Sequence, residues 1–427
     1  MELSKCIEVI KSGGKDSLFA ELYGSDEKTL QRQKERYVSA LNAFSEIFPG
    51  RSDVCVFSAP GRTEIGGNHT DHQRGVVLAG AVNCDVIAVV SFHDDGVIRV
   101  KSKEYDFAEI NLDNLEITPT DDGTQALVRG IAAAFAKKGV SVSGFDMYSS
   151  SDVIRGGGLS SSAAFETLLG TIIDVQYNSG KSTPFEIAKI GHFAENVYFG
   201  KSCGLLDQTV CSYGSLVSID FANSDSPAIE KIGFDMEKCG YSLCITDTKS
   251  SHENLTDDYV AIRSEMKSVA EFFGKDVLSE VDEAEFYAKI PELKNTVSDR
   301  AILRSIHFFD ETKRAKYESD ALKAGDVNRF LTLVNESGRS SGALLQNLYS
   351  TKTPENQSIP LALALSEKIL CGSGAVRVHG GGFAGTILAF VPFDKANEYS
   401  KTMESVFGDG SCHRMKIRQS GGTVFIR

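Results

Sequence analysis

The sequence lacks any apolar run that approaches the ~18 residues needed to cross a bilayer as a helix. Residues 1–17 also lack the uninterrupted apolar core of a signal peptide. The nine cysteines include no CxxC pair, and no histidines cluster with them at zinc-binding spacing. The odd number of cysteines and the missing secretion signal both argue against a disulfide framework. We therefore expect a cytoplasmic protein that does not bind a membrane.

Basic residues are in the minority. The chain has 45 Lys and Arg against 58 Asp and Glu, a formal net charge of -13. Binding to nucleic acid or to anionic lipid requires a basic surface that displaces counterions. Nucleic acid is therefore not an expected partner, and any phosphate group that binds must be held by local geometry.

The composition is that of a folded enzyme, with 41% hydrophobic and 24% charged residues and only 9 prolines. A length of 427 residues exceeds the size at which a single core stops growing, so two domains are expected, with a boundary near residue 215. Helical and strand patterns alternate, which predicts an α+β fold.

The predicted elements follow from hydrophobic periodicity and from caps and turns. Helices are predicted at 30–48, 124–138, 160–177, 184–200, 258–273 and 325–348. Strands are predicted at 54–58, 76–82, 85–92, 144–150, 215–220, 241–246, 375–383 and 386–391.

A turn rich in glycine and serine, VIRGGGLSSSAA at 153–164, joins a predicted strand to a predicted helix. Glycines let the backbone approach an anion, the free N–H groups of a helix start point toward it, and serine hydroxyls bind phosphate oxygens or Mg²⁺. A flexible turn is the alternative, because the chain has no G-x-x-x-x-G-K-[ST] loop and no dinucleotide fingerprint with its acidic ribose ligand. The candidate phosphate-binding residues are Gly156, Gly157, Gly158, Leu159, Ser160, Ser161 and Ser162.

Polar residues crowd a second segment, PGRTEIGGNHTDHQRG at 60–75, between two apolar strands. So many donors and acceptors beside buried strands suit a ligand with several hydroxyl groups. A polar surface loop would have the same composition, and the residues alone leave this alternative open.

Two further segments contain candidate functional residues. Asp207 in CGLLDQ follows two leucines, so its carboxylate is expected against the core, where it could orient or deprotonate a hydroxyl. An aspartate in such a place is also typical of a helix cap or an ion pair. VRVHGGGFAG at 376–385 is a second glycine-rich turn, which alone would indicate a tight hairpin.

In this order the four segments resemble the motifs of the GHMP small-molecule kinases, and among them the galactokinases. The resemblance runs from about residue 35 to the end of the chain. It implies a GHMP kinase fold of two domains with the active site in the cleft between them. The implied division is an N-terminal extension at 1–30, an N-terminal domain at 31–214 and a C-terminal domain at 215–427.

The resemblance also implies a reaction. A phosphoryl group would pass from ATP, with Mg²⁺ as cofactor, to the anomeric C1 hydroxyl of a sugar, with galactose expected first. The partners are then the small-molecule sugar and ATP, and the enzyme is expected to be a monomer or a weak homodimer.

Catalytic and metal-binding roles follow from the same resemblance. Asp207 matches the catalytic aspartate beside the anomeric hydroxyl. Arg62 matches its partner, which lowers the aspartate pKa and stabilises charge on the transferring phosphoryl group. Glu195, twelve positions before Asp207, matches the acidic ligand of Mg²⁺, with Ser162 as the hydroxyl ligand.

Sugar-binding roles follow in the same way, with one departure. Asp71 matches a contact to the C3 and C4 hydroxyls, His69 a contact nearer C6, and Tyr259 a contact near C4. Galactokinases read IGEHTDYN where this chain reads GGNHTDHQ. Asn68 therefore replaces a glutamate that accepts a hydrogen bond from the C6 hydroxyl.

This departure leaves two substrates open. A neutral amide would not repel a C6 carboxylate, and plant-type galacturonokinases resemble this chain in having a neutral residue before H-x-D-H-Q. An amide can also accept from a C6 hydroxyl, so galactose is expected ahead of galacturonate. A non-catalytic sensor of sugar and ATP is an alternative of another class, against which the intact Arg62, Glu195 and Asp207 argue.

Overall fold

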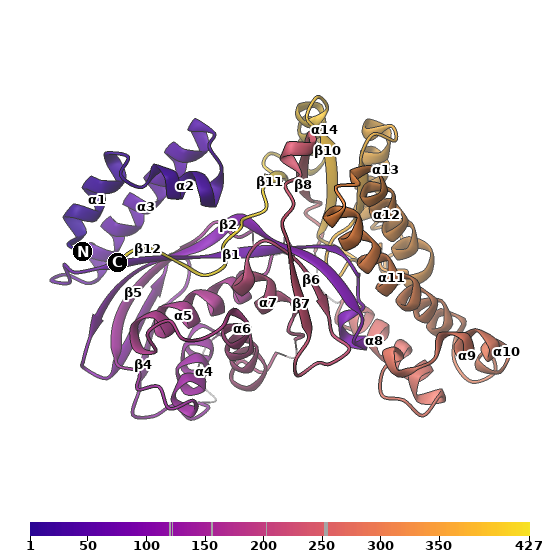
Figure 1. Ribbon diagram of the computed structural model, residues 1–427, viewed down its shortest axis with the longest axis horizontal. Helices are drawn as coiled ribbons and strands as arrows, with labels where there is room; N and C mark the ends of the chain where they lie inside the picture. Colours follow the sequence, from indigo (N-terminus) through magenta and orange to yellow (C-terminus); the bar gives the residue numbers. More distant parts are fainter. Residues whose placement is uncertain (119–120, 122, 155–156, 202, 252–254) are drawn as a thin grey trace.

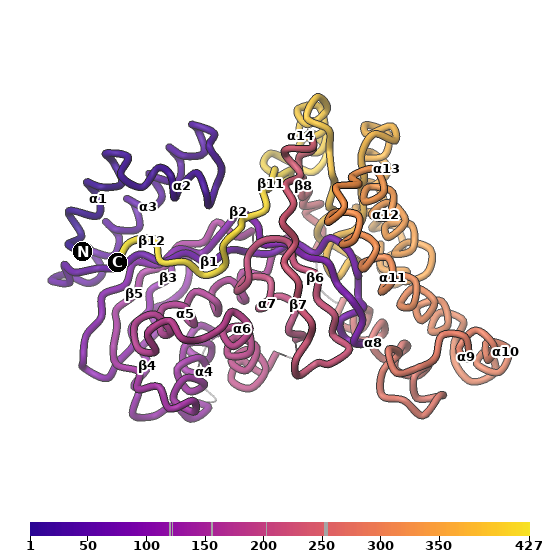
Figure 2. Tube along the Cα trace, viewed as in Figure 1, coloured from indigo at the N-terminus to yellow at the C-terminus, as the bar shows by residue number. Residues whose placement is uncertain are grey.

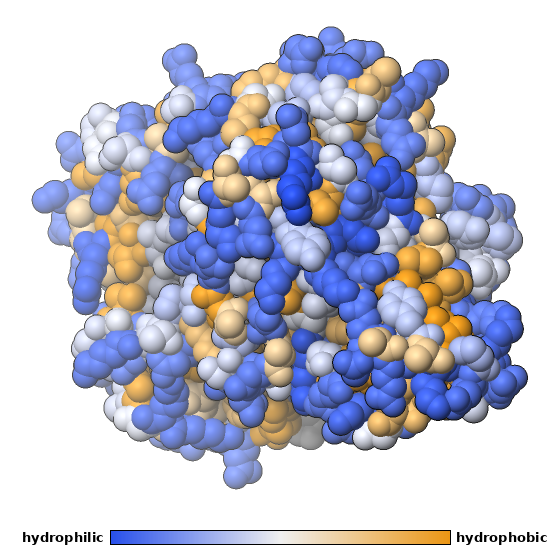
Figure 3. Space-filling model, turned by 45° about the vertical axis from the view of Figure 1, so that its right-hand side comes forward, coloured by the Kyte–Doolittle hydropathy of each residue, from blue (hydrophilic) through white to orange (hydrophobic). Residues whose placement is uncertain are grey.

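The computed structural model describes residues 1–118, 121, 123–154, 157–201, 203–251 and 255–427. Within these ranges the strands form two sheets, and helices pack on both (Figures 1 and 2). The α+β prediction is confirmed. None of the described helices is long and apolar enough to span a membrane. Hydrophilic side chains predominate on the face that Figure 3 shows, and the apolar groups there form small patches.

The larger sheet has the strand order β12-β1-β2-β5-β3-β4, with β6 paired to β2 and β7 paired to β6. Its strands are β1 (Cys55–Gly66), β2 (Val76–His93), β3 (Val97–Ser102), β4 (Phe107–Asn111), β5 (Gly144–Ser151), β6 (Leu216–Asp220), β7 (Ala228–Ile232) and β12 (Thr423–Ile426). The prediction of two strands at 76–82 and 85–92 is wrong, because β2 is continuous. One edge of β2 pairs with β1, and the other pairs with β6 over its first part and with β5 over its last part.

Helices cover both faces of this sheet (Figure 1). On one face lie α1 (Leu3–Lys11), α2 (Asp16–Tyr23) and α3 (Glu27–Ile47), with buried aromatic side chains between them and the sheet. On the other lie α4 (Gly123–Lys137), α5 (Ser161–Tyr177), α6 (Pro184–Phe193), the π-helical turn η2 (Ala194–Tyr198) and α7 (Leu206–Tyr213). A capping box begins α6, since Thr183 accepts from the Glu186 N–H and Glu186 accepts from the Thr183 N–H.

The smaller sheet has the order β11-β8-β10-β9. Its strands are β8 (Tyr241–Asp247), β9 (Ala375–Val378), β10 (Thr386–Pro392) and β11 (Cys412–Met415). The helices of this half are α8 (Thr256–Phe272), α9 (Glu283–Ala288), α10 (Ile290–Leu293), α11 (Asp299–Lys323), α12 (Val327–Ser340), η5 (Ser341–Leu345), α13 (Ser358–Leu370) and α14 (Ala396–Phe407). Short 3-10 turns occur at η1 (Asp71–Gln73), η3 (Glu237–Cys239) and η4 (Leu278–Glu280).

The chain crosses between the two halves more than once. Strands β6 and β7 belong to the larger sheet, so this half of the chain continues to Ile232. Near the C-terminus, β12 lies in the same sheet and pairs with β1. Helix α3 begins at Glu27, before the expected end of the extension at residue 30. The division at 30 and 214 stays a prediction.

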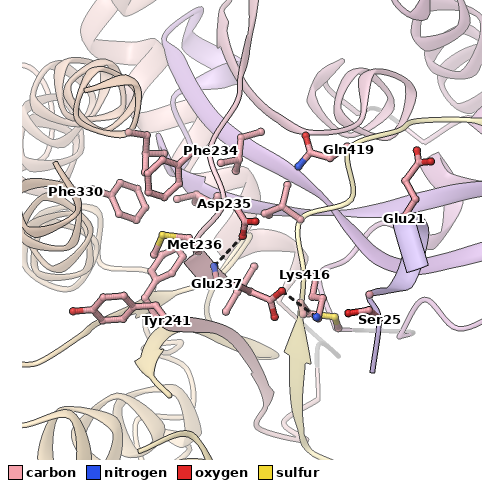
Figure 4. Close-up of a pocket in the computed structure, with 18 of the residues that line it drawn as sticks. Glu21, Ser25, Phe234, Asp235, Met236, Glu237, Tyr241, Phe330, Lys416 and Gln419 are labelled. Carbon is pink, nitrogen blue, oxygen red and sulfur yellow. Dashed lines mark hydrogen bonds and ion pairs between the residues drawn. The ribbon is translucent and has the colours of Figure 1, made fainter. Parts of the chain in front are cut away.

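A cavity of about 290 Å³ lies where the N-terminal helices meet the segment that precedes β8 (Figure 4). Its walls combine apolar side chains such as Phe234 and Phe330 with polar ones such as Asp235 and Gln419. At its rim Glu237 and Lys416 form an ion pair of 3.0 Å. The described residues that line it include none of the predicted site residues, so the predicted site lies elsewhere.

Candidate active site

Arg62 and Asp207 form a two-pronged ion pair at the centre of the site. Arg62 Nε lies 2.7 Å from Asp207 Oδ1, and Arg62 NH2 lies 2.7 Å from Asp207 Oδ2. Burial acts to raise the pKa of Asp207, but the charge and hydrogen bonds of Arg62 and a hydrogen bond from Ser160 hold it below its ordinary value. The Asp207 side chain is still 33% exposed, which leaves the carboxylate room to meet a substrate hydroxyl.

The glycine-serine turn is hydrogen-bonded to Arg62 and Asp207. Arg62 NH1 donates to the carbonyl of Gly158, the Arg62 N–H donates to the carbonyl of Leu159 at 3.0 Å, and Ser160 Oγ donates to Asp207 Oδ2. Gly158 and Ser160 have φ angles of 66° and 56°, so the turn reverses sharply before α5. Gly157, Ser161 and Ser162 adjoin this bend, whereas the predicted Gly156 lies outside the described residues.

Ser162 and Glu195 meet beside the start of α5. Ser162 Oγ donates to Glu195 Oε1 at 3.2 Å, and Lys201 Nζ donates to the same oxygen at 2.9 Å. Glu195 lies in the π-helical turn that follows α6, and its side chain is 3% exposed. A carboxylate and a hydroxyl this close together fit the oxygen ligands that Mg²⁺ prefers. Nucleotide phosphates and water would complete the coordination, because Mg²⁺ rarely takes all its ligands from protein.

The segment between β1 and β2 brings His69 and Asp71 to the same region. A Cβ atom at Gly204 would lie 2.8 Å from Asp71 Oδ2, so the carboxylate touches the backbone of the CGLLDQ segment. The pKa of Asp71 is raised, first by burial and further by the negative charge of Asp207. His69, with φ of 57°, has its Nε2 3.0 Å from the carbonyl oxygen of Gly381.

Asn68 is held inside the protein. Its Nδ2 donates to Glu64 Oε1 at 2.8 Å and to the carbonyl of Gly380 at 2.8 Å, and its Oδ1 accepts from Asn347 Nδ2 at 2.9 Å. The residue is 0% exposed. A sugar contact would require one of these bonds to break, so the geometry does not favour the predicted role of Asn68 as a sugar ligand.

Tyr259 reaches the site from α8. Its hydroxyl donates to the carbonyl of Gly382 at 2.9 Å, and its ring packs against Phe383 in an edge contact with centroids 5.4 Å apart. Burial raises the pKa of Tyr259 to about 12. The predicted residue therefore lies against the VHGGGFAG turn, and its contact with a sugar stays a prediction.

Two residues beside the predicted ones were missed from the sequence. Gln208 Nε2 donates to Glu195 Oε2 at 2.7 Å and to Glu166 Oε2 at 2.9 Å, and burial raises the pKa of Glu166 well above its ordinary value. His379 Nε2 accepts from the Glu64 N–H at 3.3 Å, and burial lowers the pKa of His379, which keeps it neutral. Gln208 lies within the CGLLDQ segment and His379 within VRVHGGGFAG, but nothing in their spacing indicates these partners.

A pocket of about 390 Å³ opens next to the start of α5. Ser161 and Ser162 lie at one side of it, and Tyr105, Phe165 and Phe199 add aromatic walls. Flat aromatic surfaces beside the predicted phosphate-binding turn would suit a nucleotide base. The sequence predicted no contacts for an adenine ring.

Two family models match the chain. The galactokinase galactose-binding signature matches residues 42–92, and the N-terminal domain of GHMP kinases matches residues 126–215. The first range contains Arg62, His69 and Asp71, and the second contains Glu195 and Asp207.

Curated relatives match most of the chain. It is 31% identical to the galactokinase of Glaesserella parasuis serovar 5, over 84% of this chain and 90% of that protein. It is 30% identical to the galactokinase of Mannheimia succiniciproducens, over 85% and 91% of the two chains.

Solved structures show the same fold. The galactokinase of Lactococcus lactis complexed with galactose superimposes with a TM-score of 0.77 at 23% identity, covering 91% of this chain and 99% of that one. The mevalonate kinase of Methanococcus jannaschii gives a TM-score of 0.61 at 16% identity, covering 86% and 99%. The fold is therefore that of the GHMP kinases, as predicted.

Proposed function

The chain belongs to the galactokinase family, and from that premise we infer that it transfers the γ-phosphoryl group of ATP to the C1 hydroxyl of galactose. The observation that carries the inference is the contact of Arg62 and Ser160 with one carboxylate, that of Asp207, at the start of α5. This contact joins a phosphate-binding turn to a group that can orient a hydroxyl.

Asp207 is the proposed catalytic residue for the sugar hydroxyl. Because Arg62 holds its pKa low, Asp207 is a carboxylate at neutral pH and can accept a hydrogen bond from the C1 hydroxyl. Phosphoryl transfer through a loose transition state needs little proton removal beforehand, so orientation of the attacking oxygen is its main contribution.

Arg62 and the start of α5 are the proposed binding groups for the phosphates. The guanidinium carries a positive charge, and the free N–H groups of the first helical turn favour anions. Ser162 and Glu195 would hold Mg²⁺, which supplies positive charge between the β- and γ-phosphates when bound. The pocket beside Tyr105 and Phe165 would take the adenine.

Asp71 and His69 are the proposed contacts to the sugar ring. Asp71 lies beside Asp207 and offers acceptor oxygens to ring hydroxyls. Tyr259 packs against the VHGGGFAG turn and would contact the C4 side of the ring.

We also propose that the enzyme works in the reducing cytoplasm. None of its nine cysteines, all of which fall in the described ranges, forms a disulfide. A monomer or a weak homodimer is the expected assembly.

The test is release of ADP by the purified chain with ATP, Mg²⁺ and a panel of sugars. Galactose should be turned over, and the phosphorus spectrum of the product should show a phosphate ester at C1. Turnover of galacturonate with none of galactose would overturn the assignment. Sugar binding without ADP release from any sugar would indicate a sensor instead.

A further inference from the structure

The side chain of Asn68, the residue expected to contact C6 of the sugar, has no free amide hydrogen to offer a ligand. Both amide hydrogens of Asn68 are donated within the protein, and its oxygen accepts from Asn347. One of those bonds runs to a carboxylate, because Asn68 Nδ2 donates to Glu64 Oε1 at 2.8 Å. Glu64, four residues earlier in the chain, therefore places a carboxylate beside position 68.

Glu64 lies on the same strand as Arg62 and on the same side of it. Strand β1 pairs regularly with β2 here, Arg62 opposite Ala81 and Glu64 opposite Ala79, so the two side chains point the same way. Glu64 is thus directed toward the face of the sheet that carries the Arg62 and Asp207 pair.

Glu64 lies near Arg62 and His69, two residues of the predicted site. Burial raises the pKa of Glu64, and the positive charges of Arg377 and Arg62 and a hydrogen bond from Asn68 oppose that rise. His69 is the residue expected near C6, and Arg62 lies by the C1 end. Glu64 is therefore close to the space that a hexose would fill.

The two carboxylate oxygens of Glu64 differ. Oε1 accepts from Asn68 and, at 3.2 Å, from Arg377 NH2. Oε2 accepts no hydrogen bond from the part of the chain that the structure describes, and the side chain retains 11% exposure. One oxygen is thus fixed by the protein and the other is available to a ligand.

We propose that Glu64 determines specificity at C6: its Oε2 accepts a hydrogen bond from a C6 hydroxyl, and its negative charge excludes a C6 carboxylate. Asn68 and Arg377 act as positioning residues that fix Oε1. This inference rests on the proposed sugar kinase activity and deepens it, because it selects galactose over galacturonate. The carboxylate that galactokinases carry at position 68 is replaced in space by one from position 64.

The test compares kcat/KM of the unaltered chain and of Glu64→Gln on galactose, 6-deoxygalactose and galacturonate. Removing the C6 hydroxyl should cost the unaltered chain at least about tenfold in kcat/KM and the variant less than about threefold. The ratio of galacturonate to galactose turnover should rise at least about tenfold in the variant. The side-chain amide that Glu64→Gln introduces keeps an oxygen for Asn68 and Arg377, so the fold should survive, which thermal unfolding would check.

Two further variants sharpen the result. Glu109→Gln is the matched control, because Glu109 is 59% exposed on β4, and it should change none of the three rates. The double variant Glu64→Asn with Asn68→Glu returns a carboxylate to position 68 and should recover the preference for galactose over galacturonate.

The outcomes separate the two claims. If the unaltered chain phosphorylates galactose but Glu64→Gln leaves all substrate ratios unchanged, the role of Glu64 is wrong and the proposed function stands. If the unaltered chain does not act on galactose, the proposed function is wrong and the role of Glu64 falls with it.

Discussion

The reactivity of Asp207 depends on two opposing influences on one carboxylate. Burial favours the protonated form, whereas the paired guanidinium of Arg62 and the hydroxyl of Ser160 favour the charged form, and the net pKa is low. A group with a depressed pKa stays ionised until the pH falls through that low value. The sugar contact of Asp207 is therefore expected to be independent of pH near neutrality.

Replacing Arg62 with Gln removes the charge that lowers the pKa of Asp207. The acid limb of the profile of kcat/KM against pH should then move to higher pH, because only the Ser160 hydrogen bond and the charge of Lys201 still oppose the effect of burial. Activity at pH 7 should fall by at least about 10²-fold, since a charge that stabilises the transferring phosphoryl group is also lost. An acid limb that stays in place, or moves to lower pH, would contradict the proposed coupling.

Glu195 is expected to act through the metal. Glu195→Gln keeps the hydrogen bond to Ser162 or Gln208 but loses the negative charge, so the Mg²⁺ concentration for half-maximal ADP release should rise at least about tenfold. The matched control is Glu230→Gln, since Glu230 is 57% exposed on β7. Equal Mg²⁺ dependence of the unaltered chain and Glu195→Gln would remove Glu195 from the metal site.

Individual residues could be predicted only where a motif names them. Arg62, Asp207 and Ser162 come from segments whose letters match a family, and Glu195 was placed by its spacing to Asp207. The structure pairs Arg62 with Asp207 and Ser162 with Glu195. The partners of Glu64 and Asn68 come from distant segments: Glu64 accepts from Arg377, 313 positions away, and Asn68 bonds to Gly380 and Asn347, 312 and 279 positions away. No spacing in the sequence carries that information.

At the scale of elements, one buried carboxylate ties the N-terminal helices to the larger sheet. Asp85 of β2 accepts from Tyr23 of α2 at 2.5 Å, from Arg36 of α3 at 2.6 Å and from Arg418 at 3.0 Å. Asp85 and Arg418 are both 0% exposed in their side chains. Four segments therefore depend on the charge of a single side chain.

Replacing Asp85 with Asn should lower the free energy of unfolding by about 3–5 kcal/mol, because it leaves the buried guanidinium of Arg418 without its counterion and removes one of the two carboxylates that pair with Arg36. The folded pKa of Asp85 is lowered, so its contribution is present above the ordinary value of about 3.9 and is lost as the pH falls through the folded value. Denaturant unfolding at neutral and acidic pH measures both effects. Asp257→Asn is the control, since Asp257 is 84% exposed, and an equally small loss in the two variants would contradict the account.

About half of the helices and strands were predicted from local signals. The predictions did not include helices α1, α2, α7, α9, α10, α11, α13 and α14 or strands β3, β4, β7, β11 and β12. The start of α6 and the end of α3 depend on residues adjacent in the sequence, a capping box at Thr183 and Glu186 and a proline at position 49. The sequence therefore indicates both. The continuous β2 was predicted as two strands, because the polar Asn83 interrupts its apolar pattern. The long helix α11 was missed, because it buries polar residues such as Arg304, His307 and Glu318 among its apolar ones.

At the scale of the whole molecule, the site is assembled from both halves. Arg62, Asp207 and the start of α5 belong to the larger sheet and its helices, whereas the VHGGGFAG turn and Tyr259 come from the other half. The Gly380 and Gly381 carbonyls touch Asn68 and His69, which joins the halves at the predicted sugar position. Substrate binding should therefore stabilise the two halves together.

The most direct measurement of the central claim is the rate of galactose-dependent ADP release by Asp207→Asn. The substitution preserves shape and removes the charge that orients the attacking hydroxyl. The rate should fall by a factor on the order of 10²–10⁴, while galactose binding stays measurable by calorimetry. A rate within about tenfold of the unaltered chain would show that Asp207 does not serve the reaction.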